Sequence, residues 1–150
     1  MRQLARRETS RRDLTRRLVS RGFERDNVDE VVSDLARRGW QSDDRYAEML
    51  VRHRVQQGYG PRRVLAELGQ QGIGDAKAWL ARAGVDWVEQ ARRAREKKYG
   101  SALPSTWQER LRQQRFLVQR GFELEQIKAA IGSVVGAEGD GVAELDNLNK

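Results

Sequence analysis

Apolar residues recur every three or four positions along most of this 150-residue chain, the spacing that gathers them on one face of an α-helix. In the middle of the chain the pattern has clear limits. Pro61 stands where a first helical residue belongs, because its fixed φ suits a helix start and no N–H is left unbonded there. Leu68 and Ile73 flank Gly72 at the spacing of a Schellman motif, in which a glycine ends the helix. The sequence therefore predicts a helix over residues 61–71.

The same helix-ending motif occurs three times. Its other two copies are Leu18, Gly22 and Phe23, and Leu117, Gly121 and Phe122. The three glycines are separated by 50 and 49 residues. A nearly constant interval that carries one helix-ending motif indicates tandem copies of one helical unit. We therefore predict an elongated, all-α chain of tandem three-helix repeats, each resembling a helix-turn-helix bundle.

The expected units are residues 1–40, 41–84 and 85–134, followed by a flexible, acidic, glycine-rich tail over 135–150. Residues 1–8 look like the last turns of a helix, so the first unit is expected to be truncated at its N-terminus. Ser10 and Thr106 begin capping-box patterns that predict helix starts, and Asp26 or Asn27 is expected to cap the second helix. The expected helices cover about 11–21, 28–38, 43–57, 61–71, 75–82, 87–99, 107–120 and a short stretch around 127–131.

The charge of the chain indicates what kind of partner it binds. The net charge is +7, with 34% charged residues, and the four segments carry +4, +2, +4 and −3. Positive charge spread over all three units favours a long anionic partner. The chain has no cysteine, which is compatible with a reducing cytosol, and no run approaches the roughly 18 apolar residues of a membrane span. We expect a cytoplasmic protein that does not enter membranes.

Several stretches, taken together, resemble one known family, the bacterial RecX regulatory proteins. They are residues 10–14 (SRRDL), 39–47 (GWQSDDRYA), 58–64 (GYGPRRV), 67–68 (EL), 72–73 (GI), 86–87 (DW), 98–100 (KYG) and 115–122 (RFLVQRGF). The similarity runs from about Arg6 to Ile131. The chain departs from the family pattern in its shorter start and in its glycine-rich acidic tail.

The resemblance implies an all-helical regulator that lies along the groove of the RecA recombinase filament. It also implies that the filament's extension, ATP hydrolysis and strand exchange are blocked, with single-stranded and possibly double-stranded DNA as part of the bound surface. Nothing in the sequence resembles a long coiled-coil seam, so the chain is expected to be a monomer.

The sequence contains no recognisable set of catalytic residues. There is no phosphate-binding loop of the Walker A type. His53, the one histidine, lies between Arg52 and Arg54 and is expected on a solvated helix face. Asp43 and Asp44 are better explained as acids in the first turn of a helix than as acid–base or metal groups. We therefore expect no catalytic activity, no cofactor and no metal.

Arginines are the candidates for partner contact, because a guanidinium group pairs equally well with protein carboxylates and DNA phosphates. Tyr59 is the best aromatic candidate, whereas Trp79, Trp87 and Trp107 have the helical spacing of core residues. The predicted partner-binding residues are Arg12, Arg16, Arg17, Arg45, Arg52, Tyr59, Arg62, Arg63, Arg112, Arg115 and Arg120.

Two other functions remain open at this point. Helix pairs such as 43–57 and 61–71 could act as a helix-turn-helix reader of specific duplex sequences, although no single helix joins a basic face to the Asn and Gln side chains that base contacts favour. A general binder of RNA or single strands is the third possibility. Inhibition of RecA-dependent ATP hydrolysis would separate the first function from both alternatives.

Overall fold

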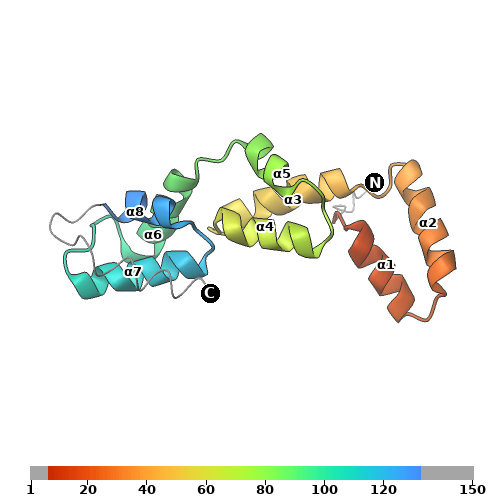
Figure 1. Cartoon of the computed structure of the whole chain (residues 1–150), viewed down its shortest axis with the longest axis horizontal. Coiled ribbons are helices and arrows are strands. Elements are labelled where there is room, and N and C mark those ends of the chain that lie inside the picture. Colours follow the sequence, from red (N-terminus) through yellow and green to blue (C-terminus); the bar gives the residue numbers. More distant parts are fainter. Residues whose placement is uncertain (1–6, 133–150) are drawn as a thin grey trace, which may run out of the picture.

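The structure is a computed structural model that describes residues 7–132. In that range the chain forms eight α-helices and no strand, arranged as an elongated array (Figure 1). Their bounds are α1 Arg11–Ser20, α2 Arg25–Arg37, α3 Asp43–Gln56, α4 Pro61–Gln70, α5 Ala76–Ala83, α6 Trp87–Tyr99, α7 Trp107–Gln119 and α8 Leu124–Ile131. We call α1–α2 repeat 1, α3–α5 repeat 2 and α6–α8 repeat 3. The predicted all-α repeat fold is confirmed, whereas the expected tail over 135–150 lies outside the described residues.

The three predicted Schellman ends are present. The N–H groups of Phe23, Ile73 and Phe122 donate to the carbonyl oxygens five residues earlier, at 3.4, 3.0 and 3.1 Å. The intervening glycines have φ of +97°, +69° and +93°, values that glycine adopts without steric cost. Helices α1, α4 and α7 therefore end with the same backbone geometry, as the repeated motif predicted.

The predicted caps Ser10 and Thr106 are present, because the side chain of each accepts a hydrogen bond from the backbone N–H three residues on. The side chains of Ser42 and Asp86 cap α3 and α6 in the same way. The expectation that Asp26 or Asn27 caps the second helix is wrong. Helix α2 begins at Arg25, with Glu24 as an N-cap that makes no side-chain bond, so Asp26 instead lies in the first turn, where the helix dipole favours an acid.

The prediction that helical turns reach Glu8 is also wrong, since residues 7–10 are not helical. This segment instead runs against repeat 2. The carboxylate of Glu8 pairs with Arg45 at 3.0 Å, and the carbonyl of Thr9 accepts a hydrogen bond from Gln41. These contacts hold the chain extended up to the N-cap Ser10.

Two separate hydrophobic cores lie in repeats 2 and 3. Leu68 and Leu117 are fully buried in the first and the second core respectively. Trp87 packs against both cores, and Trp79 packs against the first, which confirms the prediction for these two tryptophans. Trp107 is 50% exposed, so its predicted core role is wrong. It occupies the first position of α7, where half of its surface is left uncovered.

Repeats 2 and 3 meet by close backbone contact at the start of α4, which we call joint 2–3. The N–H of Gly60 donates to the carbonyl of Arg120 at 2.8 Å, and the N–H of Arg62 donates to that of Gly121 at 2.9 Å. A Cβ added to Gly60 would lie 2.5 Å from backbone atoms of Gly121 and Phe122. Only glycine permits this approach, so the turn before α4 joins the two repeats.

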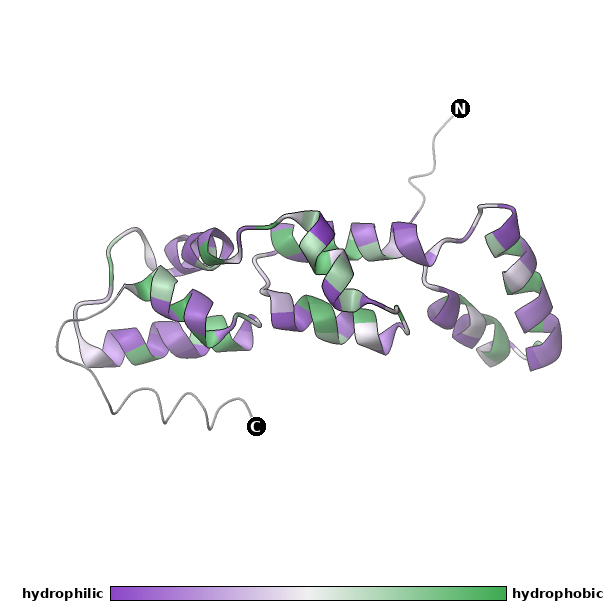
Figure 2. Cartoon of the chain, turned by 45° about the horizontal axis from the view of Figure 1, so that its top comes forward, coloured by the Kyte–Doolittle hydropathy of each residue, from purple (hydrophilic) through white to green (hydrophobic). Residues whose placement is uncertain are grey.

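Repeats 1 and 2 meet at a corresponding place, the start of α1 against the end of α4, which we call joint 1–2. The hydroxyl of Ser10, which is buried, donates to the side chain of Gln71. The guanidinium of Arg12 donates to the carbonyl of Gln70 at 2.9 Å. Helices α7, α4 and α1 therefore follow one another end to end along the molecule (Figure 1). Hydrophilic and hydrophobic positions are interleaved along the helices (Figure 2).

Candidate partner interface at joint 2–3

Tyr59, in the turn between α3 and α4, lies between two arginines from different repeats. The guanidinium carbon of Arg63 is 4.3 Å from the centre of its ring, and that of Arg120 is 4.6 Å from it. Arg63 is also 3.6 Å from the carboxylate of Glu67. Cation–π contacts of this kind each contribute on the order of 0.5–1 kcal/mol at exposed sites. Tyr59 thus links repeats 2 and 3 and holds two cations at the surface.

The alternation of cations and rings continues into repeat 3. Arg120 lies 5.5 Å from the ring of Phe116, and the ammonium of Lys98 lies 4.4 Å from the same ring. Tyr99 meets Phe116 edge to face, with ring centres 5.6 Å apart and an interplanar angle of 84°. Three rings and three cations from α4, α6, α7 and the turn before α4 therefore form one continuous cluster. We call it the cation–aromatic patch.

A groove of about 410 Å³ extends the patch between α6 and α7. Arg112 and Arg115 line it, together with Lys98 and Phe116, and none of the residues that line it is acidic. The three cations that line the groove, Lys98, Arg112 and Arg115, favour the approach of phosphate or carboxylate groups. The predicted residues Tyr59, Arg63, Arg112, Arg115 and Arg120 thus gather in one region. Arg62 lies exposed at the start of α4, beside the same joint.

The remaining predicted residues do not join this patch. Arg16 and Arg17 both pair with Asp13, at 2.6 and 2.8 Å, and their side chains are 71% and 59% exposed. Such surface pairs are worth less than about 1 kcal/mol, so both arginines can exchange Asp13 for an anion on a partner. Arg12 fastens joint 1–2, and Arg45 holds Glu8 and the carbonyl of Gly39.

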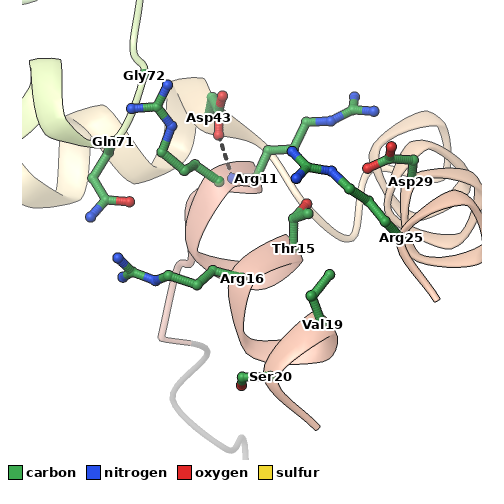
Figure 3. A pocket seen from close by; sticks show the side chains of 11 residues that line it. Arg11, Thr15, Arg16, Val19, Ser20, Arg25, Asp29, Asp43, Gln71 and Gly72 are labelled. Atoms are coloured by element: carbon green, nitrogen blue, oxygen red, sulfur yellow. Dashed lines mark hydrogen bonds between the residues drawn. The ribbon is translucent and has the colours of Figure 1, made fainter. Parts of the chain in front are cut away.

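Arg12 and Arg16 line a second groove, of about 600 Å³, between repeat 1 and the end of α4 (Figure 3). Arg11 and Arg25 line it as well, opposite Asp29 and Asp43. The backbone N–H of Arg11 donates to Asp43 at 2.8 Å, the bond drawn dashed in Figure 3. Because carboxylates face this groove, its positive potential is weaker than that of the groove beside Arg112.

Arg52 lies in a third place, a groove of about 700 Å³ beside α3 and α5. Trp79 and Arg82 line the same groove, with the Arg82 guanidinium 5.0 Å from the Trp79 ring. The structure therefore places nine of the eleven predicted residues in three regions, whereas Arg17 and Arg45 line none of the three and pair with Asp13 and Glu8. Sequence reasoning missed Lys98, Tyr99 and Phe116 as members of the main patch, although a basic and an aromatic residue adjoin at 98–99 and again at 115–116.

The groups with displaced pKa values lie outside the patch and have structural causes. Hydrogen bonds from the backbone N–H groups of Ser105 and Thr106 lower the pKa of Glu109. A side-chain bond from Arg92 lowers the pKa of Glu89. Burial raises the pKa of Tyr46. In the described part of the chain, no three His, Cys, Asp or Glu residues are placed to hold a metal ion.

None of the helices between residues 7 and 132 is both long and apolar enough to cross a membrane. What the fold and the patch define is a tandem helical-repeat protein with a positively charged face that spans two repeats. Models of two RecX domains match it, the second three-helix domain over residues 42–78 and the third over residues 85–131. The chain belongs to the RecX family of regulatory proteins.

Its relatives are similar over most of their length. The regulatory protein RecX of Halorhodospira halophila is 43% identical over 132 residues, which cover 87% of this chain and 82% of the relative. That of Ectopseudomonas mendocina is 44% identical over 126 residues, covering 83% and 84%. A crystal structure of RecX from Lactobacillus salivarius superposes with a TM-score of 0.68 over 96% of this chain and 90% of that one, at 23% identity. This last likeness establishes the shared fold.

Proposed function

We propose that this chain binds the filament that the RecA recombinase forms on DNA and restrains its extension, ATP hydrolysis and strand exchange. It acts in the cytoplasm and performs no catalysis of its own. The observation that carries the proposal is the cation–aromatic patch, which crosses a joint between two repeats of an elongated array. A rod with several charged contact points suits a polymeric partner, because linked weak contacts add to tight binding.

Both the filament protein and its DNA can supply the anions. The groove beside Arg112 has a volume of about 410 Å³ and no acidic lining residue, and Tyr59 and Phe116 hold neighbouring cations in place. Pre-ordered cations lose less conformational entropy when the partner binds. The exposed arginines of repeat 1, Arg16 and Arg17, lie on the far repeat and would add contacts at a distance along the filament.

The test is RecA-dependent ATP hydrolysis on single-stranded DNA with this chain present below the RecA concentration. The unaltered protein should suppress hydrolysis. The double variant R62E/R112E should need about tenfold more protein for the same effect, since each reversal opposes the partner's charge. Arg37→Glu is the matched control, because Arg37 is 71% exposed and lies outside the patch. Unchanged hydrolysis with equimolar unaltered protein would refute the proposal.

A sequence-reading helix-turn-helix formed by α3 and α4 is the alternative, and joint 2–3 weighs against it. A recognition helix contacts base edges through its N-terminal residues. Here the first turn of α4 lies against the end of α7, where Gly60 and Arg62 donate their N–H groups to Arg120 and Gly121. Binding to a duplex without recombinase, with a strong preference for one sequence, would favour the alternative.

A further inference from the structure

Helices α1, α4 and α7 end in the same motif, but only two of these three ends are covered within the described residues. At the end of α7, Arg63 lies 2.7 Å from the position that a Cβ on Gly121 would take. At the end of α4, the guanidinium of Arg12 lies 3.1 Å from the corresponding position on Gly72. At the end of α1, a Cβ on Gly22 would have no atom within 4 Å.

The open end of α1 closely matches the covered end of α7. Residues 18–23 (LVSRGF) and 117–122 (LVQRGF) differ at one position, and their glycines have φ of +97° and +93°. Just after α7, the carbonyl groups of Arg120 and Gly121 accept the N–H groups of Gly60 and Arg62 at the start of α4. The end of α1 therefore presents the same backbone acceptors to a helix start, and Phe23 and Val19 beside it are 58% and 39% exposed.

The matching open helix start is that of α7, at the opposite end of the molecule (Figure 1). Helix α1 begins against the end of α4, and α4 begins against the end of α7. The start of α7, in contrast, lies at the outer edge of repeat 3. Trp107, its first residue, is 50% exposed, and Leu103 just before it is 59% exposed. Gln108 occupies the second helical position, which Arg12 and Arg62 occupy in the other two helices.

We propose that copies of this chain associate head to tail, with the start of α7 in one copy docked on the end of α1 in the next. The contact follows joint 1–2, in which Ser10 is the N-cap of the docked helix. Thr106 holds that position in α7, and its Cβ excludes the closer backbone approach that Gly60 permits at joint 2–3. A helix start carries partial positive charge and a helix end partial negative charge, so the two ends attract. Trp107 and Phe23, both exposed in the single copy, would cover each other.

Such a contact is small, and the free protein stays largely monomeric at micromolar concentration. Copies that lie side by side on a polymer experience a local concentration on the order of millimolar, where a weak contact becomes effective. The use of the contact on a filament depends on the proposed function. The contact itself does not, and it is therefore tested without recombinase or DNA.

The full-length chain has no cysteine, so engineered cysteines report the contact directly. Arg21→Cys places a thiol at the exposed end of α1, and Gln108→Cys places one at the exposed start of α7. An equal mixture of the two single variants, treated with a short bismaleimide, should give a mixed dimer. The matched mixture of Arg37→Cys with Gln108→Cys should give about tenfold less, because Arg37 lies on α2 away from the joint surface. Equal yields from the two mixtures would overturn the proposal.

A second measurement tests whether the cross-link comes from a specific contact or from random collision of the two cysteine variants. Phe23→Asp, combined with Arg21→Cys, places a charge in the apolar part of the contact, and the 58% exposure of Phe23 predicts little effect on folding. The mixed dimer with Gln108→Cys should fall to the level of the control mixture, while the circular dichroism spectrum stays unchanged. An undiminished yield in a folded variant contradicts head-to-tail docking. Such a result would not bear on the proposed function, which is tested separately by RecA-dependent ATP hydrolysis with the unaltered protein.

Discussion

Gly60→Ala tests whether joint 2–3 is a rigid fastening. Gly60 has φ −92° and ψ 175°, a backbone conformation open to any residue, so alanine meets no backbone strain there. Its Cβ, however, would lie 2.5 Å from the carbonyl group of Gly121 and from the N–H of Phe122. Both are backbone atoms, which cannot rotate away as a flexible side chain would. The repeats must separate to admit one methyl group.

The expected cost follows from the contacts that separation breaks. Two backbone hydrogen bonds contribute about 0.5–1.5 kcal/mol each, and overpacking of a close contact costs about 1–3 kcal/mol. We expect the free energy of unfolding to fall by about 3 kcal/mol. For a chain of this size that corresponds to a decrease in Tm of about 6–12 °C. Since each repeat keeps its own core, the transition should also broaden as the repeats lose their coupling.

The assay is urea and thermal unfolding followed by tryptophan fluorescence, because Trp87 packs against both cores and senses the joint. Gly69→Ala is the matched control in the same helix. A Cβ on Gly69 meets nothing within 4 Å, so alanine there should stabilise the helix by about 0.5–1 kcal/mol. If Gly60→Ala leaves the free energy of unfolding within 0.5 kcal/mol of the parent, the close backbone contact does not exist as described.

Two further substitutions probe the ends of other helices. Asp43→Ala removes the acceptor of the Arg11 N–H, so the free energy of unfolding should fall by about 1–2 kcal/mol and amide exchange in α1 should become faster. Asp44→Ala is the control, because Asp44 is adjacent and exposed, and it should change little. Equal effects of the two substitutions would argue against the bond. Hydrogen bonding from Ser105 lowers the pKa of Glu109 in the folded chain, so its stabilising contribution is complete above the ordinary glutamate pKa and is lost as the pH falls through the lowered value. Urea unfolding should therefore show the parent more stable than Glu109→Gln at pH 7 and the difference shrinking on acidification; a pH-independent difference would exclude this origin.

Local signals predicted most of the fold. A proline at a helix start, a serine at an N-cap and a glycine between Leu68 and Ile73 act through the backbone of their own neighbourhood, so short sequence patterns determine them. The predicted N-cap of α2 was wrong because an acid such as Asp26 suits the first turn of a helix as well as the N-cap, and a local pattern does not separate the two. The predicted burial of Trp107 was wrong because helical spacing does not show whether a neighbouring element covers the residue.

The candidate site was predictable only in part. Arg63 and Arg120 were chosen for their charge. They are 57 positions apart in the sequence, and no local pattern indicates that both contact the ring of Tyr59. That arrangement follows from the joint, which brings the end of α7 to the start of α4. Lys98 was missed because its neighbour Phe116 belongs to another helix. Pairings between helices depend on how repeats dock, which composition and spacing do not encode.

The joints also change how the net charge of +7 bears on binding. Arg12 and Arg45 use their guanidinium groups on carbonyl oxygens and a carboxylate of the chain itself, and Arg95, only 1% exposed, donates to the carbonyl of Ala102 at 3.1 Å. Reversing any of these charges would loosen the array and weaken partner binding indirectly. Arg62 and Arg112 are exposed, and their side chains fasten neither joint, so their reversal tests partner contact more directly. The positive charge left for the proposed partner is therefore smaller than the composition suggests, and much of it lies where repeats 2 and 3 join.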